Sequence, residues 1–154
     1  MKAYQKLSST DVAETEAIGI ALAKEMLAEP SLPPFIALYG DLGVGKTAFI
    51  RGFSSVIAPK SAVRSPTFAL VNEYPAKPRA LFHFDMYRIE SEDDLDSLGF
   101  YDYLERNGIC LVEWSENIPY AIPDELIRVT ISKVSREKPT LRTVTMELIK
   151  EEHA

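Results

Sequence analysis

The segment of residues 40–47, Gly-Asp-Leu-Gly-Val-Gly-Lys-Thr, constrains this chain more than any other stretch. It fits G-x-x-x-x-G-K-[ST], the pattern of a loop that binds phosphate groups, at every fixed position. Glycines let backbone N–H groups curl around an anion with no Cβ in the way, and the start of a following helix adds about half a positive charge. We therefore expect a phosphate-binding loop here.

Both flanks of this loop have the character that the motif requires. Residues Phe35–Tyr39 are all apolar, which is typical of a strand buried on both faces. After the loop, apolar residues recur at helical spacing: Phe49, Ile50, Phe53, Val56 and Ile57. In a strand–loop–helix unit of this kind, Lys46 reaches the β- and γ-phosphates of a nucleotide and the Thr47 hydroxyl ligates Mg²⁺.

Length and composition narrow the class of protein. The 154 residues predict a single domain over 1–154, with a frayed tail at 150–154. The net charge of −6 gives no basic footprint for binding nucleic acid unaided. The single cysteine excludes an internal disulfide and a cysteine metal cluster, and we expect Cys110 to be an inert core thiol. With no long apolar run and no signal-peptide core, a soluble cytoplasmic protein without membrane contact is expected.

The remaining chain predicts an α/β fold of the P-loop NTPase type, in three layers around a mixed parallel and antiparallel sheet. The strands at 35–39 and 109–114 are expected to be parallel at its centre. Short links predict antiparallel hairpins for the strand pairs 68–74 with 81–85 and 126–132 with 141–148. Residues 4–7 are expected to form a short edge strand. The helical segments expected outside the phosphate loop run from Ser9, Thr10 or Asp11 to Pro30, and from the acidic run near Glu90 to Gly108.

Two carboxylates follow buried strands, where a phosphate-binding loop needs an acid that holds Mg²⁺ directly or through water. Asp85 ends the strand at 81–85, and Glu113 ends the apolar run that begins at Ile109. One acid could hold the metal while the other orients an attacking water, and the residues alone leave that division open. We expect His83 to be structural and to lie on the opposite face of its strand from Asp85. The start of the first helix offers Ser9, Thr10 or Thr15 as neighbours of the nucleotide base.

Three functions remain open from the residues alone. An N-K-x-D segment, which guanine-specific GTPases use to read their base, does not occur. A small-molecule kinase shares the loop and the length, but no arginine cluster marks a lid. The other two possibilities are an ATPase subunit that drives a conformational cycle and a nucleotide-dependent switch or adaptor whose hydrolysis is not required.

Four segments together resemble the bacterial TsaE family, formerly YjeE. They are the loop at 40–47, Ser-Pro-Thr-Phe at 65–68, His-Phe-Asp-Met-Tyr-Arg at 83–88 and Val-Glu-Trp at 112–114. The resemblance covers about residues 4–132 in order, whereas the C-terminal hairpin is less distinctive. It implies a Mg²⁺-dependent ATPase that works with TsaB and TsaD in making threonylcarbamoyladenosine next to the tRNA anticodon. The partners, rather than this acidic chain, would make most of the tRNA contacts.

The resemblance also implies roles for particular residues. Lys46 binds phosphate, Thr47 and Glu113 hold Mg²⁺, and Asp85 is the hydrolytic residue. Thr67 senses the γ-phosphate and Trp114 lies close to the nucleotide. The ATP-binding set expected on this basis is Asp41, Leu42, Gly43, Val44, Gly45, Lys46, Thr47, Ala48, Thr67 and Trp114, with Thr10 from the helix start. With no arginine finger evident in the chain, we expect slow turnover by the isolated subunit.

Overall fold

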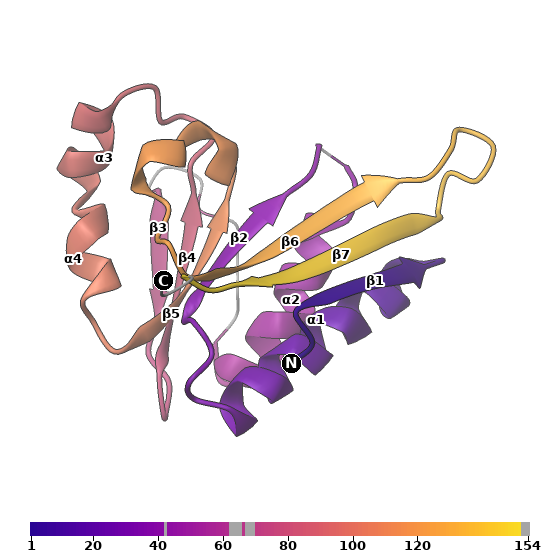
Figure 1. Ribbon diagram of the computed structural model, residues 1–154, viewed down its shortest axis with the longest axis horizontal. Coiled ribbons are helices and arrows are strands. Elements are labelled where there is room, and N and C mark those ends of the chain that lie inside the picture. The colour runs from indigo at the N-terminus through magenta and orange to yellow at the C-terminus, as the bar shows by residue number, and fades with distance from the viewer. Residues whose placement is uncertain (42, 62–65, 67–69, 152–154) are drawn as a thin grey trace.

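A computed structural model describes residues 1–41, 43–61, 66 and 70–151 of the chain (Figure 1). The helices are α1 (Val12–Ala28), α2 (Lys46–Ile57), α3 (Glu92–Leu98) and α4 (Phe100–Leu104), with 3₁₀ turns η1 (Ser115–Asn117) and η2 (Pro119–Ala121). The strands are β1 (Tyr4–Ser9), β2 (Phe35–Tyr39), β3 (Val71–Tyr74), β4 (Ala80–Asp85), β5 (Gly108–Glu113), β6 (Leu126–Lys133) and β7 (Arg142–Ile149).

The strands form one seven-stranded sheet in the order β1-β7-β6-β2-β5-β4-β3. β2 is parallel to β5 and β6, and β5 is parallel to β4. β3 with β4, β6 with β7 and β1 with β7 are antiparallel. The mixed sheet, its parallel centre and both predicted hairpins are therefore confirmed, and β1 is the predicted edge strand. Of the strand predicted at 68–74, β3 covers 71–74, and residues 68 and 69 lie outside the described residues.

Alternate residues of the central strands point into two separate cores. Ile36 and Leu38 of β2 pack with α1 and α2, whereas Phe35 and Ala37 pack with α3, α4 and the turns after β5. Figure 1 shows the two helical groups on opposite sides of the sheet. A strand buried on both faces reads as a continuous apolar run, which is how β2 and β5 could be identified from the sequence.

Helix α1 begins where local hydrogen bonds satisfy its first turn. Asp11 is the N-cap, and its side chain accepts a hydrogen bond from the Glu14 backbone N–H at 2.8 Å. The Glu14 carboxylate in turn accepts from the Thr10 N–H at 2.8 Å. Of the three predicted helix starts, the structure therefore selects Asp11, and the helix ends before Pro30 as expected.

Two glycines set how closely α1 and α2 approach. A Cβ added to Gly19 would lie 2.3 Å from the Phe49 carbonyl oxygen, and one added to Gly52 would lie 2.0 Å from the Glu16 carbonyl oxygen. The backbones can cross at this distance only because neither position has a side chain. This crossing packs α2 against the N-terminal half of α1.

The acidic segment differs from the single broken helix expected there. Gly99, with φ 76°, ends α3 and begins α4, because a left-handed residue cannot continue an α-helix.

Within the described ranges, every helix is too short or too polar to cross a membrane.

Candidate phosphate-binding site

The loop at 40–47 connects the carboxyl end of β2 to the start of α2. Gly40, Gly43 and Gly45 have φ values of 142°, 77° and 109°, in the region that side chains rarely adopt. A Cβ at Gly43 would meet no atom within 4 Å, so the space beside it is open. The loop therefore turns its backbone at three glycines and opens onto free volume at the N-terminus of a 12-residue helix. Both features favour binding of an anion.

Lys46 is the first residue of α2, and its ammonium group lies inside this site. The residue is 6% exposed, and its Nζ has no hydrogen-bond partner among the described residues. The Nζ lies 4.4 Å from the centroid of the Trp114 ring, a cation–π contact. A buried ammonium without a hydrogen-bond acceptor is costly, so an anion that accepted from Nζ would satisfy an unmet requirement.

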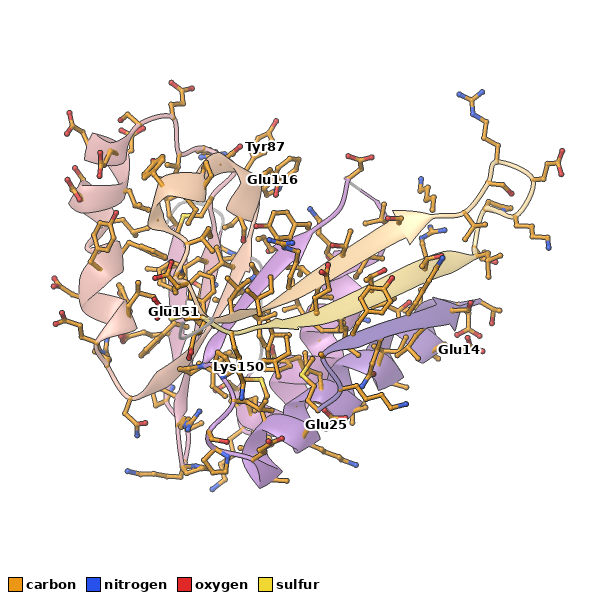
Figure 2. All side chains as sticks on the ribbon, in the orientation of Figure 1. Glu14, Glu25, Tyr87, Glu116, Lys150 and Glu151 are labelled. Atoms are coloured by element: carbon orange, nitrogen blue, oxygen red, sulfur yellow. The ribbon has the colours of Figure 1, made fainter. Side chains whose placement is uncertain are left out.

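Trp114 is held over Lys46 by an unusual backbone conformation. Its φ of 58° makes it the only positive-φ residue other than glycine in the described part of the chain. Tyr87 also packs against the indole, with ring centroids 5.0 Å apart. Figure 2 shows Tyr87 and Glu116 on the outside of the molecule at this end of the sheet, and Tyr87 is 58% exposed. Trp114 therefore contacts both Lys46 and Tyr87 at this end of the sheet.

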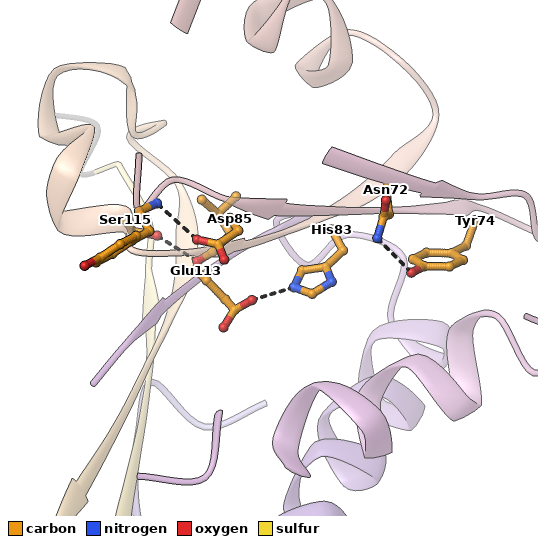
Figure 3. Close-up of polar contacts among 8 residues, drawn as sticks. Asn72, Tyr74, His83, Asp85, Glu113 and Ser115 are labelled. Carbon is orange, nitrogen blue, oxygen red and sulfur yellow. Dashed lines mark hydrogen bonds and ion pairs between the residues drawn. The ribbon is translucent and has the colours of Figure 1, made fainter. Parts of the chain in front are cut away.

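The two predicted acids are neighbours. Asp85 and Glu113 are register partners at the ends of the parallel strands β4 and β5, and Glu113 is also opposite Leu38 of β2. Glu113 is 8% exposed, and its Oε2 lies 2.8 Å from His83 Nε2 (Figure 3). Parallel strands bring their carboxyl ends to one edge of a sheet, which explains the juxtaposition.

The prediction that His83 lies on the opposite face from Asp85 is wrong. Residues two apart on a strand share a face, since side chains alternate with a period of two. His83 is buried, at 1% exposed, and both His83 and Glu113 act electrostatically on the Asp85 carboxyl. His83 is therefore structural in the sense that it anchors Glu113, but it does so inside the candidate site.

The pKa of the Asp85 carboxyl is raised above its ordinary value of 3.8. Partial burial is the largest cause, and the neighbouring Glu113 adds to it. The Tyr87 N–H, which donates to Asp85 Oδ1 at 3.0 Å, opposes the rise, as do His83 and Lys46. Asp85 and Lys46 thus share one electrostatic environment, although they lie 39 positions apart in the sequence.

Asn117 joins the two turns that follow β4 and β5. Its Nδ2 donates to the Met86 carbonyl at 2.9 Å and to the Tyr87 carbonyl at 3.3 Å. Nothing in the sequence marks this contact, because a lone Asn in a Pro-rich segment is most simply read as a loop residue. The side chain nevertheless fixes the turn that carries Asp85 beside the turn that carries Trp114.

The other predicted binding residues differ in how far they are buried. Asp41 and Thr47 are exposed, whereas Val44 and Ala48 are buried and anchor the loop and the helix start in the core. Leu42 and Thr67 lie outside the described residues. Thr10 is exposed, and of the three helix-start candidates it is Thr15 that meets the loop: its Cγ2 lies 3.8 Å from a Cβ built on Gly45.

Sequence reasoning missed Arg142, which begins β7. Its Nε donates to the Val44 carbonyl at 2.8 Å, and its Nη2 lies 3.5 Å from the Gly43 carbonyl oxygen. The partners are separated by 98 and 99 positions in the sequence, so no local pattern predicts the contact.

The side chains available for a metal are oxygen donors. In the described part of the chain, no group of three or more His, Cys, Asp or Glu residues could hold an ion. The Thr47 hydroxyl and the Glu113 carboxylate suit Mg²⁺, which takes few protein ligands and keeps several waters or phosphate oxygens. The donor chemistry therefore fits a Mg²⁺ ion that arrives with a phosphate ligand.

A cavity of about 410 Å³ adjoins the phosphate loop, lined by Gly40, Asp41, Val44, Ile131, Ser132 and Lys133. A larger cavity, of about 620 Å³, lies at the opposite end of the strands, where β4 and β5 begin. The larger cavity is lined by none of the predicted site residues, so its size does not make it the functional site.

Comparison with known proteins gives one consistent result. The sequence model of the family described as "Threonylcarbamoyl adenosine biosynthesis protein TsaE" matches residues 9–142. A relative named tRNA threonylcarbamoyladenosine biosynthesis protein TsaE, from Haemophilus influenzae, is 41% identical over 96 residues, which is 62% of this chain and 61% of that protein. The match thus spans less than two thirds of the length of the Haemophilus protein.

The alignments with other similar proteins cover a larger share of both chains. The protein of the same name from Bacillus subtilis is 36% identical over 77% of this chain and 73% of its own length, and that from Rickettsia bellii is 33% identical over 87% and 93%. The crystal structure of YdiB from Bacillus subtilis is similar with a TM-score of 0.76 and 28% identity, covering 97% of this chain and 88% of that one.

Proposed function

This chain belongs to the TsaE family of threonylcarbamoyl adenosine biosynthesis proteins, and from this premise we propose that it is the ATP-binding and ATP-hydrolysing subunit of that pathway. In this proposal it acts with TsaB and TsaD partners to support repeated threonylcarbamoylation of the adenosine next to the tRNA anticodon. Because tRNA is the molecule modified, the proposed place of action is the cytoplasm.

One observation carries the nucleotide-binding part of the proposal. The Lys46 ammonium is buried with no hydrogen-bond partner among the described residues, beside an open glycine loop at a helix N-terminus. The protein holds a positive charge in place for a ligand rather than for its own fold. Triphosphate oxygens are the acceptors that this loop pattern binds.

The proposed roles of the acids follow from their surroundings. Glu113 is anchored through one carboxylate oxygen by His83, which fixes the direction of the group, and with Thr47 it would hold Mg²⁺. Mg²⁺ would supply charge neutralisation on the phosphates. Asp85 is more exposed than Glu113 and is held by the Tyr87 N–H, so it is the acid suited to orienting a water molecule for hydrolysis.

Aromatic and loop residues complete the proposed site. Trp114 contacts Lys46 and would lie beside the phosphates. Asp41, Gly43, Val44, Gly45 and Ala48 would contribute the backbone of the cradle. Leu42 and Thr67 keep their predicted roles as loop and γ-phosphate-sensing residues.

Reconstitution tests the function directly. TsaB, TsaD and unmodified tRNA would be incubated with ATP, with and without this protein, and modified adenosine counted per TsaD molecule. We expect modification to continue over several turnovers only when this protein is present. Equal multiple-turnover yields without it would contradict the proposal.

The Asp85→Ala variant separates hydrolysis from binding in the same assay. We expect it to bind ATP and to fail in repeated modification. If it supported repeated modification without hydrolysing ATP, the chain would be a nucleotide-dependent switch. If phosphate transfer to an added metabolite were detected instead, the chain would be a small-molecule kinase.

A further inference from the structure

Arg142 connects the C-terminal hairpin to the phosphate loop. Its Nε and Nη2 groups face the carbonyls of Val44 and Gly43, at 2.8 and 3.5 Å. Its Nη1 donates to the carbonyls of Pro139 at 2.6 Å and Leu141 at 3.2 Å, within the connection between β6 and β7. Figure 1 shows this hairpin projecting beyond the rest of the sheet. One guanidinium therefore spans two segments that are otherwise distant in sequence.

The contact controls the direction of N–H groups as well as carbonyls. A peptide unit is planar and trans, so its N–H points away from its C=O. When Arg142 holds the carbonyls of Gly43 and Val44 on the outside of the loop, the N–H groups of Val44 and Gly45 point to the inside. Those are N–H groups that a bound phosphate would use in this loop.

Among the described residues of the loop, few other constraints act at this point. Gly43 and Gly45 both have positive φ and no side chain, so their peptide units can rotate at little steric cost. The buried Val44 side chain fixes one residue between them. The guanidinium restrains the peptide units on either side of Val44, and a cation on a carbonyl also polarises the N–H of the same unit, which makes it a better donor.

We propose that Arg142 is a positioning residue that aims the Val44 and Gly45 N–H groups at the phosphates of the nucleotide. This inference rests on the proposed function and extends it to a residue of the C-terminal hairpin. It predicts that Arg142 acts on phosphate affinity and not on recognition of the base or ribose.

The test compares ATP with inorganic triphosphate, which has no base or ribose, by calorimetric titration of the full chain. We expect Arg142→Gln to weaken both ligands by the same factor, about tenfold, as is typical when hydrogen bonds to a charged group are lost. Arg142→Lys keeps the charge but loses the several N–H donors of the guanidinium. We expect its affinity for both ligands to lie between those of Arg142→Gln and the wild type.

Arg136→Gln is the matched control. Arg136 is exposed in the same hairpin, so its replacement removes the same charge. We expect its affinity for both ligands to match that of the wild type. Melting temperatures without ligand identify any variant that does not fold, and in that case the Arg142→Lys variant supplies the comparison.

Three results would overturn the inference. A loss for ATP without a loss for inorganic triphosphate would mean that Arg142 acts on the base or ribose. An equal loss of affinity in Arg136→Gln would mean that the effect comes from the positive charge of the hairpin and not from the contact of Arg142 with the loop. Wild-type affinity in Arg142→Gln would show that the contact has no effect on binding. A wild-type protein that bound neither ligand would instead refute the proposed function, on which this inference depends.

Discussion

The two faces of the sheet are built from the same strands and do different work. On β4 and β5, Phe82, Phe84, Cys110 and Val112 point to one side, and the alternate residues point to the other. The first side, which we call the aromatic face, is apolar, and its rings pack edge to face. The ring centroid of Phe84 lies 5.3 Å from that of Phe100 and 5.2 Å from that of Tyr103. The second side, the helix-pair face, packs α1 and α2 and contains buried His83, Glu113 and Lys46.

The difference shows which face contains the energetically unfavourable buried charges. Burying Lys46 and Glu113 requires compensation, since a buried charge without a partner is unfavourable by several kcal/mol. The helix-pair face contains these groups beside the phosphate loop in addition to its own apolar core, whereas the described buried side chains of the aromatic face include no charged group. The comparison predicts that substitutions of aromatic-face core residues change stability, whereas substitutions of the buried polar and charged groups on the helix-pair face change ligand binding.

Phe84→Ala should have the largest effect on folding. Phe84 is fully buried among aromatic rings, so its truncation should lower the free energy of unfolding by about 3–5 kcal/mol. The affinity of the folded fraction for ATP should stay at the wild-type value. Urea unfolding and calorimetry measure the two quantities, and a large loss of ATP affinity in fully folded protein would break the division between the faces.

Lys46→Met should have the opposite pattern. Methionine keeps an apolar stem but has no charge, so stability without ligand should not fall, and ATP binding should be lost. At ATP concentrations about 100 times the wild-type Kd, the wild type should gain about 2.7 kcal/mol of stability and the variant none. The same ATP-induced rise in melting temperature in both proteins would refute the assignment of the loop.

His83 provides a matched pair of variants on the helix-pair face. In His83→Gln the amide nitrogen can occupy the place of Nε2 and still donate to Glu113, whereas the shorter side chain of His83→Asn cannot reach it. We expect Asn, but not Gln, to reduce the Mg²⁺-dependent part of ATP affinity by about tenfold, as for other residues that orient metal ligands. Equal losses in both variants, or none in either, would mean that His83 does not orient Glu113.

Asp85→Asn should have the smallest effect, and its sign depends on pH. The folded protein binds the Asp85 proton more tightly than the unfolded chain does, because the pKa of the carboxyl is raised above 3.8. The contribution of the Asp85 carboxyl to the free energy of unfolding is therefore complete below pH 3.8. It is lost as the pH rises through the pKa of this carboxyl in the folded protein. Asn should make the nucleotide-free protein slightly more stable than wild type at pH 7, with the difference shrinking toward pH 4. A less stable variant at pH 7 would contradict the burial argument.

Much of the fold could be predicted because its signals are local. The apolar runs of β2 and β5, the short hairpin links and the loop motif each lie within a few residues of sequence. Strand ends also placed Asp85 and Glu113 together, since parallel strands align their carboxyl ends. Gly99 was not recognised as a helix break, because apolar spacing continues across it from Leu98 to Tyr101.

The contacts that escaped prediction are long-range. Arg142 reaches the phosphate loop, and Asn117 reaches the turn after β4, by tertiary packing that no periodicity encodes. The position of His83 was a different kind of failure, because the period-two rule, applied correctly, puts it beside Asp85. Its hydrogen bond to Glu113 still required the register of β4 on β5.

Trp114 offers the most direct test that a triphosphate binds at Lys46. It is the only tryptophan in the chain, and its ring contacts the Lys46 ammonium 4.4 Å away. Titration with ATP and Mg²⁺ should therefore change the tryptophan fluorescence of the wild type, with a midpoint equal to the calorimetric Kd, and leave that of Lys46→Met unchanged. ATP binding detected by calorimetry without any change in Trp114 emission would place the nucleotide elsewhere and contradict the account.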